Sequence, residues 1–119
     1  MRLAIRALGA TLLLSILAVG CGSTASESST PAGGSAVSIT RAFTFDPPQL
    51  SVDRGAAVTW TNTDIIQHTV TSGAAGSPTG KFDQRVDPGG TFTFTFADAG
   101  TYEFFCNIHR GMRGEVVVK

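Results

Sequence analysis

Hydrophobic and polar residues alternate along much of the chain after residue 36. The clearest case is residues 91–96, where threonine and phenylalanine take turns, so that one face of an extended segment is polar and the other apolar. Other short stretches are rich in β-branched and aromatic residues and are bounded by turn-forming residues. We therefore expect β-strands over residues 37–45, 49–52, 57–61, 67–71, 81–86, 91–96, 101–106 and 114–119.

Turn-forming residues separate these strands at short intervals, for example at Asp53-Arg54-Gly55 and at Asp87-Pro88-Gly89-Gly90. Seven or eight short strands at such intervals indicate an all-β fold, a two-sheet Greek-key β-sandwich. Residues 72–80 contain three glycines and a proline, and we expect a mobile loop there. The sandwich accounts for residues 36–119, which we interpret as one folded domain.

The two-residue period also predicts which side chains face the interior. Glu103 should point to solvent, so Phe104 and Cys106 should point inward. In the segment 67–71, His68 faces the same way as Val70 and should also be buried. Taken alone, such a histidine is expected to satisfy its ring with a backbone carbonyl, because buried polar groups usually find such partners.

The N-terminus has a different pattern. Arg2 and Arg6 precede an uncharged apolar run, which predicts a secretory signal over residues 1–20 and export from the cytoplasm. The end of the run resembles a bacterial lipoprotein processing site, so we expect lipid on Cys21 and anchoring to a membrane, on its periplasmic or outer face. An ordinary cleaved signal followed by an incidental cysteine is the alternative. Residues 21–35 are rich in Ser, Thr, Gly and Pro, which predicts a flexible linker.

Charge narrows the choice of partners only slightly. Nine basic side chains balance nine acidic ones, so no strong field favours nucleic acid, and we expect none as a partner. We expect a monomer. The chain has two cysteines, and a disulfide between Cys21 and Cys106 would not close a compact framework, because Cys21 lies outside the predicted domain.

Three metal-binding residue types follow one another at intervals of three near the C-terminus: Cys106, His109 and Met112. Thiolate, imidazole and thioether are donors that copper prefers, and one more imidazole would complete a trigonal site with a weak axial sulfur. The only other histidine is His68, which is predicted to face the same interior as Cys106. The pattern therefore predicts a site for one copper ion.

Two stretches of the chain resemble a known family. Residues 58–62 leading to 68–70, together with residues 102–118, resemble the plastocyanin and amicyanin branch of the cupredoxins, the small blue-copper proteins. The resemblance covers nearly all of residues 36–119. The spacing Cys106-x-x-His109-x-x-Met112 is similar to the short ligand loop of amicyanin.

The resemblance implies a cupredoxin-like domain with one type 1 copper ion that alternates between Cu(I) and Cu(II). It implies electron transfer between a redox donor protein and a redox acceptor protein. It also implies the copper ligands His68, Cys106, His109 and Met112. Where this family often has Asn after the first His and Ser or Thr after the Cys, this chain has Thr69 and Asn107. We hypothesise that these two residues bond across the two ligand-bearing loops and lock them together.

Other uses of the same residues remain open at this point. A copper-binding module for storage or delivery would need the same ligands, and a structural zinc site could use the Cys and His residues. A Cys106–His109 nucleophile pair would need a third, orienting group, which the sequence does not supply. Because no open, water-holding position and no general base is evident, we do not expect an enzyme.

Overall fold

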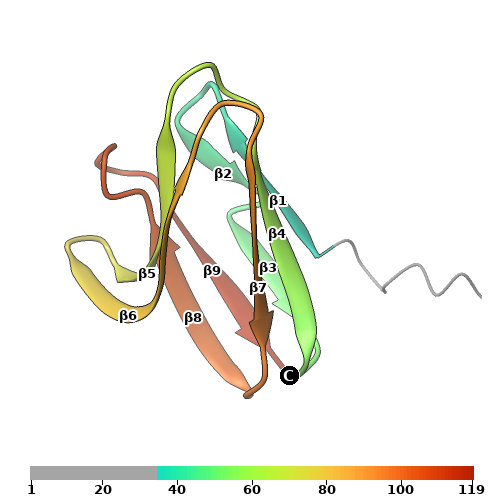
Figure 1. The fold of residues 1–119 in the computed structure, drawn as a ribbon. Helices are drawn as coiled ribbons and strands as arrows, with labels where there is room; N and C mark the ends of the chain where they lie inside the picture. Colours follow the sequence, from blue (N-terminus) through green and yellow to red (C-terminus); the bar gives the residue numbers. More distant parts are fainter. Residues whose placement is uncertain (1–34) are drawn as a thin grey trace, which may run out of the picture.

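The computed structural model describes residues 35–119, and it shows nine β-strands in two sheets (Figure 1). The signal, the lipid on Cys21 and most of the linker were predicted for residues that lie outside this described part. Within it, no helix is long and apolar enough to cross a bilayer. The strands are β1 (Ala36–Thr40), β2 (Thr44–Asp46), β3 (Gln49–Val52), β4 (Ala56–Asn62), β5 (His68–Ala74), β6 (Ser77–Val86), β7 (Thr91–Phe96), β8 (Gly100–Phe105) and β9 (Arg113–Val118).

The two sheets are both mixed. One has the strand order β2-β1-β4-β7 and the other has the order β3-β9-β8-β5-β6. Strand β1 runs parallel to β4 and β3 runs parallel to β9, whereas the other neighbours are antiparallel. The chain passes from one sheet to the other five times, at the connections β2–β3, β3–β4, β4–β5, β6–β7 and β7–β8. The prediction of an all-β two-sheet sandwich is confirmed, with nine strands rather than seven or eight.

The additional strand arises at the N-terminal end of the domain. Residues 37–45 were expected to form one strand, but the chain turns at residues 41–43 and forms an antiparallel hairpin of β1 and β2. The turn is closed by a hydrogen bond from the Phe43 N–H to the Thr40 carbonyl, at 3.0 Å. Phe43 has a φ of 58°, in the left-handed region that bulky residues rarely occupy. The sequence contains no glycine or asparagine here that would have indicated the turn.

The loop predicted over residues 72–80 is wrong. Strand β5 continues to Ala74 and β6 begins at Ser77, so the segment forms a hairpin with a register shift between Thr71 and Gly73. Gly73 has a φ of 120°, and a Cβ atom there would lie 2.2 Å from the Ser77 carbonyl oxygen. The glycines therefore serve a bulge and a tight turn within a paired hairpin.

The core lies between the sheets and is centred on Trp60, which is fully buried. Its ring stacks on Phe92 with a centroid distance of 5.6 Å and meets the edge of Phe104 at 5.3 Å. The phenylalanines of β7 face this core, with Phe96 buried and Phe92 and Phe94 half-buried, as their alternation with threonine predicts. Among the described residues, the Trp60 Nε1 atom is the one buried side-chain nitrogen or oxygen without a hydrogen-bond partner.

Candidate metal centre

His68 begins strand β5, directly after the loop that leaves β4. Its side chain is fully buried, as the two-residue period predicts. The expected backbone partner is wrong, however, because the His68 Nε2 atom lies 2.9 Å from the Oδ2 atom of Asp64. The ring is thus paired with the carboxylate of a residue that is itself buried.

The loop between β8 and β9 carries Cys106, His109 and Met112. Phe105 pairs with Arg113 in the register of the two strands, so the loop leaves and re-enters the sheet at adjacent positions. The Cys106 N–H donates to the Met112 carbonyl at 3.0 Å, which ties the two ends of the loop together. Cys106 and Met112 are buried, whereas His109 is partly exposed.

Three side chains from these two segments converge on one point. The His68 Nδ1 and His109 Nδ1 atoms are 3.1 Å apart, and the Cys106 Sγ atom lies 3.5 Å from the Nδ1 of His109 and 3.9 Å from that of His68. All three donor atoms lie within 4.8 Å of one another. Met112 belongs to the same loop and is buried, and its role as a fourth ligand stays a prediction.

The protonation of this cluster fits a bound cation. The hydrogen bond from His68 holds the pKa of Asp64 below its usual value, so this carboxylate is ionised at neutral pH and can only accept. The His68 Nε2 atom must then carry the proton, which leaves the lone pair of Nδ1 facing His109 and Cys106. A lone pair, a second imidazole nitrogen and a sulfur that face one another are a donor set that could hold a metal ion.

The spacing of the donor atoms also fits one ion. With metal–nitrogen bonds of about 2.0 Å and a metal–sulfur bond of about 2.3 Å, a planar trigonal site has nitrogens about 3.5 Å apart and sulfur–nitrogen separations of about 3.7 Å. The observed separations lie within a few tenths of an ångström of these values. A set of two imidazoles and one thiolate suits copper, zinc and related borderline ions.

A series of hydrogen bonds supports Cys106, the predicted sulfur ligand. The Thr69 N–H donates to the Cys106 Sγ atom at 3.3 Å, and this donor stabilises negative charge on the sulfur. The Thr69 hydroxyl accepts a hydrogen bond of 2.7 Å from the Asn107 N–H. Thr69 and Asn107 therefore bond across the two ligand-bearing segments, as hypothesised, but through the backbone of Asn107 while its side chain is exposed.

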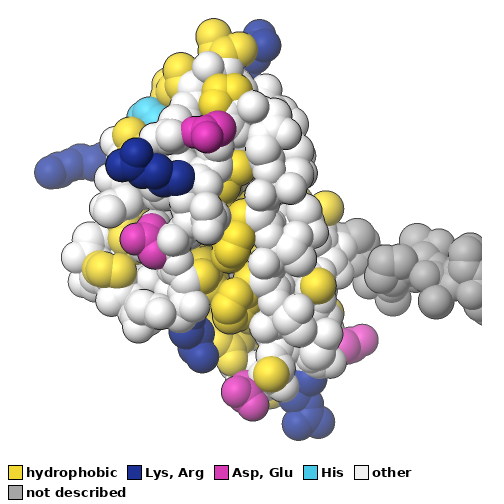
Figure 2. Space-filling view, viewed as in Figure 1, with side chains coloured by type: hydrophobic (Ala, Val, Ile, Leu, Met, Phe, Trp, Pro, Cys, Tyr) yellow, Lys and Arg dark blue, Asp and Glu magenta, His cyan; other side chains and the backbone are white. Residues whose placement is uncertain are grey.

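The surface over the cluster is apolar. Four large hydrophobic side chains are exposed in the described part of the chain, and all belong to loops at the metal end of the sandwich: Phe43, Ile65, Ile66 and Ile108. We call these four residues the apolar cap. The ring of Phe43 lies 5.1 Å from the ring of His109, centroid to centroid, and Figure 2 shows apolar side chains gathered at this end.

Two residues of the site were missed in the sequence. Asp64 could have been found, because a carboxylate four residues before a predicted ligand, in the loop leading to it, is a candidate partner for that ligand. The sequence contained no such signal for Phe43, because the turn that brings it to His109 lies within residues 37–45, which were predicted to form one strand.

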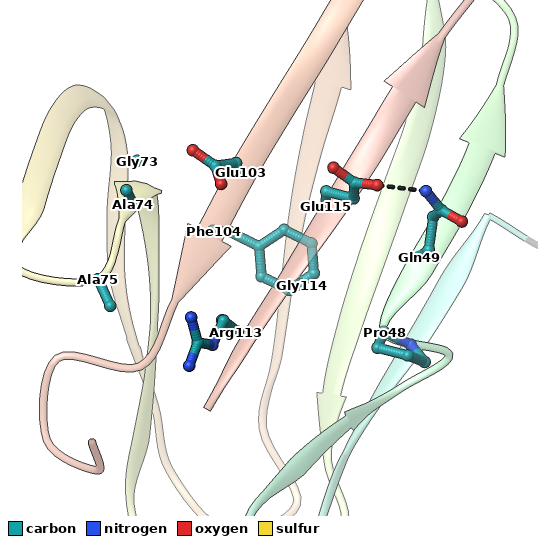
Figure 3. Close-up of a pocket in the computed structure, with 10 residues that line it drawn as sticks. All are labelled: Pro48, Gln49, Gly73, Ala74, Ala75, Glu103, Phe104, Arg113, Gly114 and Glu115. Carbon is teal, nitrogen blue, oxygen red and sulfur yellow. Dashed lines mark hydrogen bonds between the residues drawn. The ribbon is translucent and has the colours of Figure 1, made fainter. Parts of the chain in front are cut away.

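A separate cavity of about 430 Å³ lies beside strands β8 and β9 (Figure 3). Its lining includes Glu103, Arg113 and Glu115 and none of the four predicted copper ligands. The Gln49 side chain donates a hydrogen bond to the Glu115 carboxylate at its edge. This cavity is therefore separate from the cluster of His68, Cys106 and His109.

The fold and this cluster define a copper-binding β-sandwich, and comparison with known proteins agrees. The profile of the family described as copper binding proteins, plastocyanin/azurin family, matches residues 33–119. The chain therefore belongs to this family, the cupredoxins, and the resemblance seen in the sequence is confirmed.

Individual relatives are similar over most of the domain. The chain is 33% identical over 90 residues to amicyanin-alpha of Methylorubrum extorquens, a match that covers 75% of each protein. It is 35% identical over 82 residues to amicyanin of Paracoccus denitrificans, where the match covers 63% of this chain and 58% of the relative. The solved structure of a novel purple cupredoxin from Nitrosopumilus maritimus superposes with a TM-score of 0.65 at 28% identity, covering 71% of this chain and 98% of that one.

Proposed function

We propose that the protein is a type 1 copper protein that carries single electrons between a redox donor and a redox acceptor. The observation that supports this most directly is the convergence of the donor atoms of His68, Cys106 and His109 within 4.8 Å. These residues and Met112 would hold the ion. When bound, copper supplies the one-electron chemistry by alternating between Cu(I) and Cu(II).

The chain itself would supply a rigid and dry environment. His68 and Cys106 are buried, and backbone hydrogen bonds tie the loop that carries Cys106 at both of its ends. Donor atoms held in this way need little rearrangement when the charge of the site changes by one. We regard this as the physical basis for transfer, rather than for bond-making chemistry at the site.

The partly exposed His109 is the proposed route for the electron. It is the one of the three converging residues that reaches the surface, and Phe43 of the apolar cap lies beside its ring. An apolar surface allows a partner protein to approach closely and exclude water over the histidine edge. Arg110, which follows His109 directly, is exposed and adds a positive charge beside this route.

We also propose that the carrier works outside the cytoplasm, held to a membrane through lipid on Cys21. The basic start and the apolar run before this cysteine support that location. Storage or delivery of copper remains the rival use of the same ligands, and it differs in requiring that the ion be released.

The test is to load the full-length protein with Cu(II) and record its visible spectrum and voltammogram. We expect an intense visible band from thiolate-to-copper charge transfer and a reversible one-electron wave. Cys106→Ser should lose both, whereas Asn107→Ala, a change in the exposed neighbouring side chain, should keep both. A colourless oxidised protein would contradict the proposal, and rapid loss of copper to a chelator with no redox exchange would favour delivery instead.

A further inference from the structure

Asp64 is held in place by the loop between β4 and β5. Its backbone N–H donates to the Asn62 Oδ1 atom at 2.9 Å, and its Oδ1 atom accepts the Ile65 N–H at 2.6 Å. The Asn62 amide in turn donates to the carbonyls of Ile66 and Val86, at 2.7 and 2.9 Å. The second carboxylate oxygen, Oδ2, is thereby fixed in one direction.

That direction is toward His68. The Oδ2 atom lies 2.9 Å from His68 Nε2, and both side chains are almost completely shielded from water, with exposed fractions of 5% for Asp64 and 0% for His68. The opposite ring nitrogen, Nδ1, is the atom that faces His109 and Cys106. The His68 ring therefore lies between the Asp64 carboxylate on one side and the donor atoms of His109 and Cys106 on the other.

We propose that Asp64 is a positioning residue of the metal centre, which selects the Nε2–H tautomer of His68 and makes its Nδ1 atom a stronger donor to the ion. The inference rests on the proposed copper function, and it adds a residue that sets the reduction potential of the copper ion. A buried negative charge behind the ligand stabilises the more highly charged ion, because Coulomb interactions are strong where water is excluded. Asp64 should thus favour Cu(II) over Cu(I) and lower the reduction potential.

A purely structural role for Asp64 predicts a different effect of substitution on the His68 tautomer and on the reduction potential. If the residue only shaped the loop, removing its charge would change stability and leave the tautomer and the potential as they are. Asp64→Asn keeps the size of the side chain and removes the charge. His68 and Ile65 approach different oxygens of Asp64, and asparagine has an oxygen at only one of these two positions, so one of the two acceptors is lost.

Asp87→Asn is the matched control. Asp87 follows Val86, the residue that pairs with His68 in the sheet, and its exposed carboxylate accepts a hydrogen bond from Gln67 rather than from a predicted ligand. The control removes one negative charge from the same end of the molecule without changing the partner of His68. Comparing the two variants separates the specific contact from the general effect of charge.

Three measurements at neutral pH test the proposal on the full-length protein. In the metal-free wild type, nitrogen NMR of the His68 ring should show the proton on Nε2. Binding of Zn(II), which is redox-inert, should weaken by about 10- to 100-fold in Asp64→Asn, as is typical when the partner of a ligating histidine is lost. The copper potential of this variant should rise by at least about 59 mV, which is a tenfold change in the preference between the two oxidation states.

The control should leave all three quantities close to the wild-type values. A proton on Nδ1 in the wild type would overturn the proposal, as would an Asp64→Asn protein with unchanged zinc affinity and copper potential. If Asp64→Asn does not fold, the position of the proton on the His68 ring of the wild-type protein decides whether the proposal holds. Wild-type protein that stays colourless with copper would reject the electron-transfer function, while the tautomer and zinc measurements would still judge the role of Asp64.

Discussion

Thr69 is the residue that joins the two ligand-bearing segments. Its N–H donates to the Cys106 sulfur, and its hydroxyl accepts the N–H of Asn107. The hydroxyl also lies 3.0 Å from that of Thr71, which donates to the Asp83 carboxylate at 2.9 Å. Because the Thr71 hydroxyl gives its one proton to Asp83, it must accept from the Thr69 hydroxyl. The remaining lone pair of the Thr69 oxygen then accepts the Asn107 N–H.

This orientation predicts unequal effects of two substitutions. Thr69→Val removes the acceptor and leaves the Asn107 N–H partly buried without a partner, so we expect a loss of about 1–3 kcal/mol in the free energy of unfolding. Asn107→Ala keeps the backbone N–H and should change this free energy by less than about 0.5 kcal/mol. Denaturant titration of the metal-free proteins measures both. Equal losses in the two variants would show that the side chain of Asn107 takes part after all.

At the scale of strands, the alternation of residues was a good guide wherever one face of a strand is buried. It placed the phenylalanines of β7 in the core and His68 in the interior, and both are observed. It failed where conformation depends on contacts that the local sequence does not encode. The left-handed Phe43 and the bulged Gly73 are set by what packs against them, so the β1–β2 turn and the β5–β6 hairpin were not predicted.

The same distinction applies to the metal centre. The ligand spacing within residues 106–112 is local and could be found in the sequence, and the scarcity of histidine pointed to His68. The carboxylate behind His68 could not be derived from alternation, because Asp64 lies in a loop where side-chain direction follows no period. The fold and the three converging donors were thus within reach of the sequence. Asp64 could be named there as a candidate partner of His68, but its contact with the ring could not be derived.

The start of β9 gives a prediction about packing. A Cβ atom on Gly114 would lie 2.5 Å from the Phe104 ring and 2.7 Å from the Pro48 carbonyl oxygen, so Gly114→Ala must relieve both of these short contacts. We expect a loss of about 1–3 kcal/mol in the free energy of unfolding, as is typical of overpacking. Phe104 lies two residues before Cys106, so the visible spectrum of the copper-loaded variant should also shift.

The control for this change is Arg113→Ala, one residue earlier in the same strand. Arg113 is exposed, and its truncation should alter the free energy of unfolding by no more than about 0.5 kcal/mol. If Gly114→Ala is as stable as this control, the contact between β9 and Phe104 has room for an added methyl group, and the overpacking argument is wrong.

For the whole molecule, the proposed anchor and the metal centre should be independent. Strand β1 begins at Ala36, next to the predicted linker, and ends at Thr40, just before the turn that carries Phe43 of the apolar cap. The start of the described domain and the turn that carries Phe43 therefore lie at opposite ends of this strand.

The anchor itself gives a prediction at this scale. The wild-type protein, expressed with its own N-terminus in a bacterium that processes lipoproteins, should be recovered with the membranes and extracted by detergent. Cys21→Ser should be recovered in the soluble exported fraction, because lipid can no longer be attached, and it should keep the wild-type copper spectrum. Identical fractionation of the two proteins would argue for an ordinary cleaved signal.

The solitary tryptophan gives this molecule a built-in optical reporter. Trp60 is the only indole in the chain, it is wholly enclosed by other aromatic rings, and its N–H meets no polar partner there. Its fluorescence in the native state should therefore be emitted at unusually short wavelength and move to the red once water reaches the ring. Disruption of the sandwich can then be followed without any label, separately from the colour of the metal.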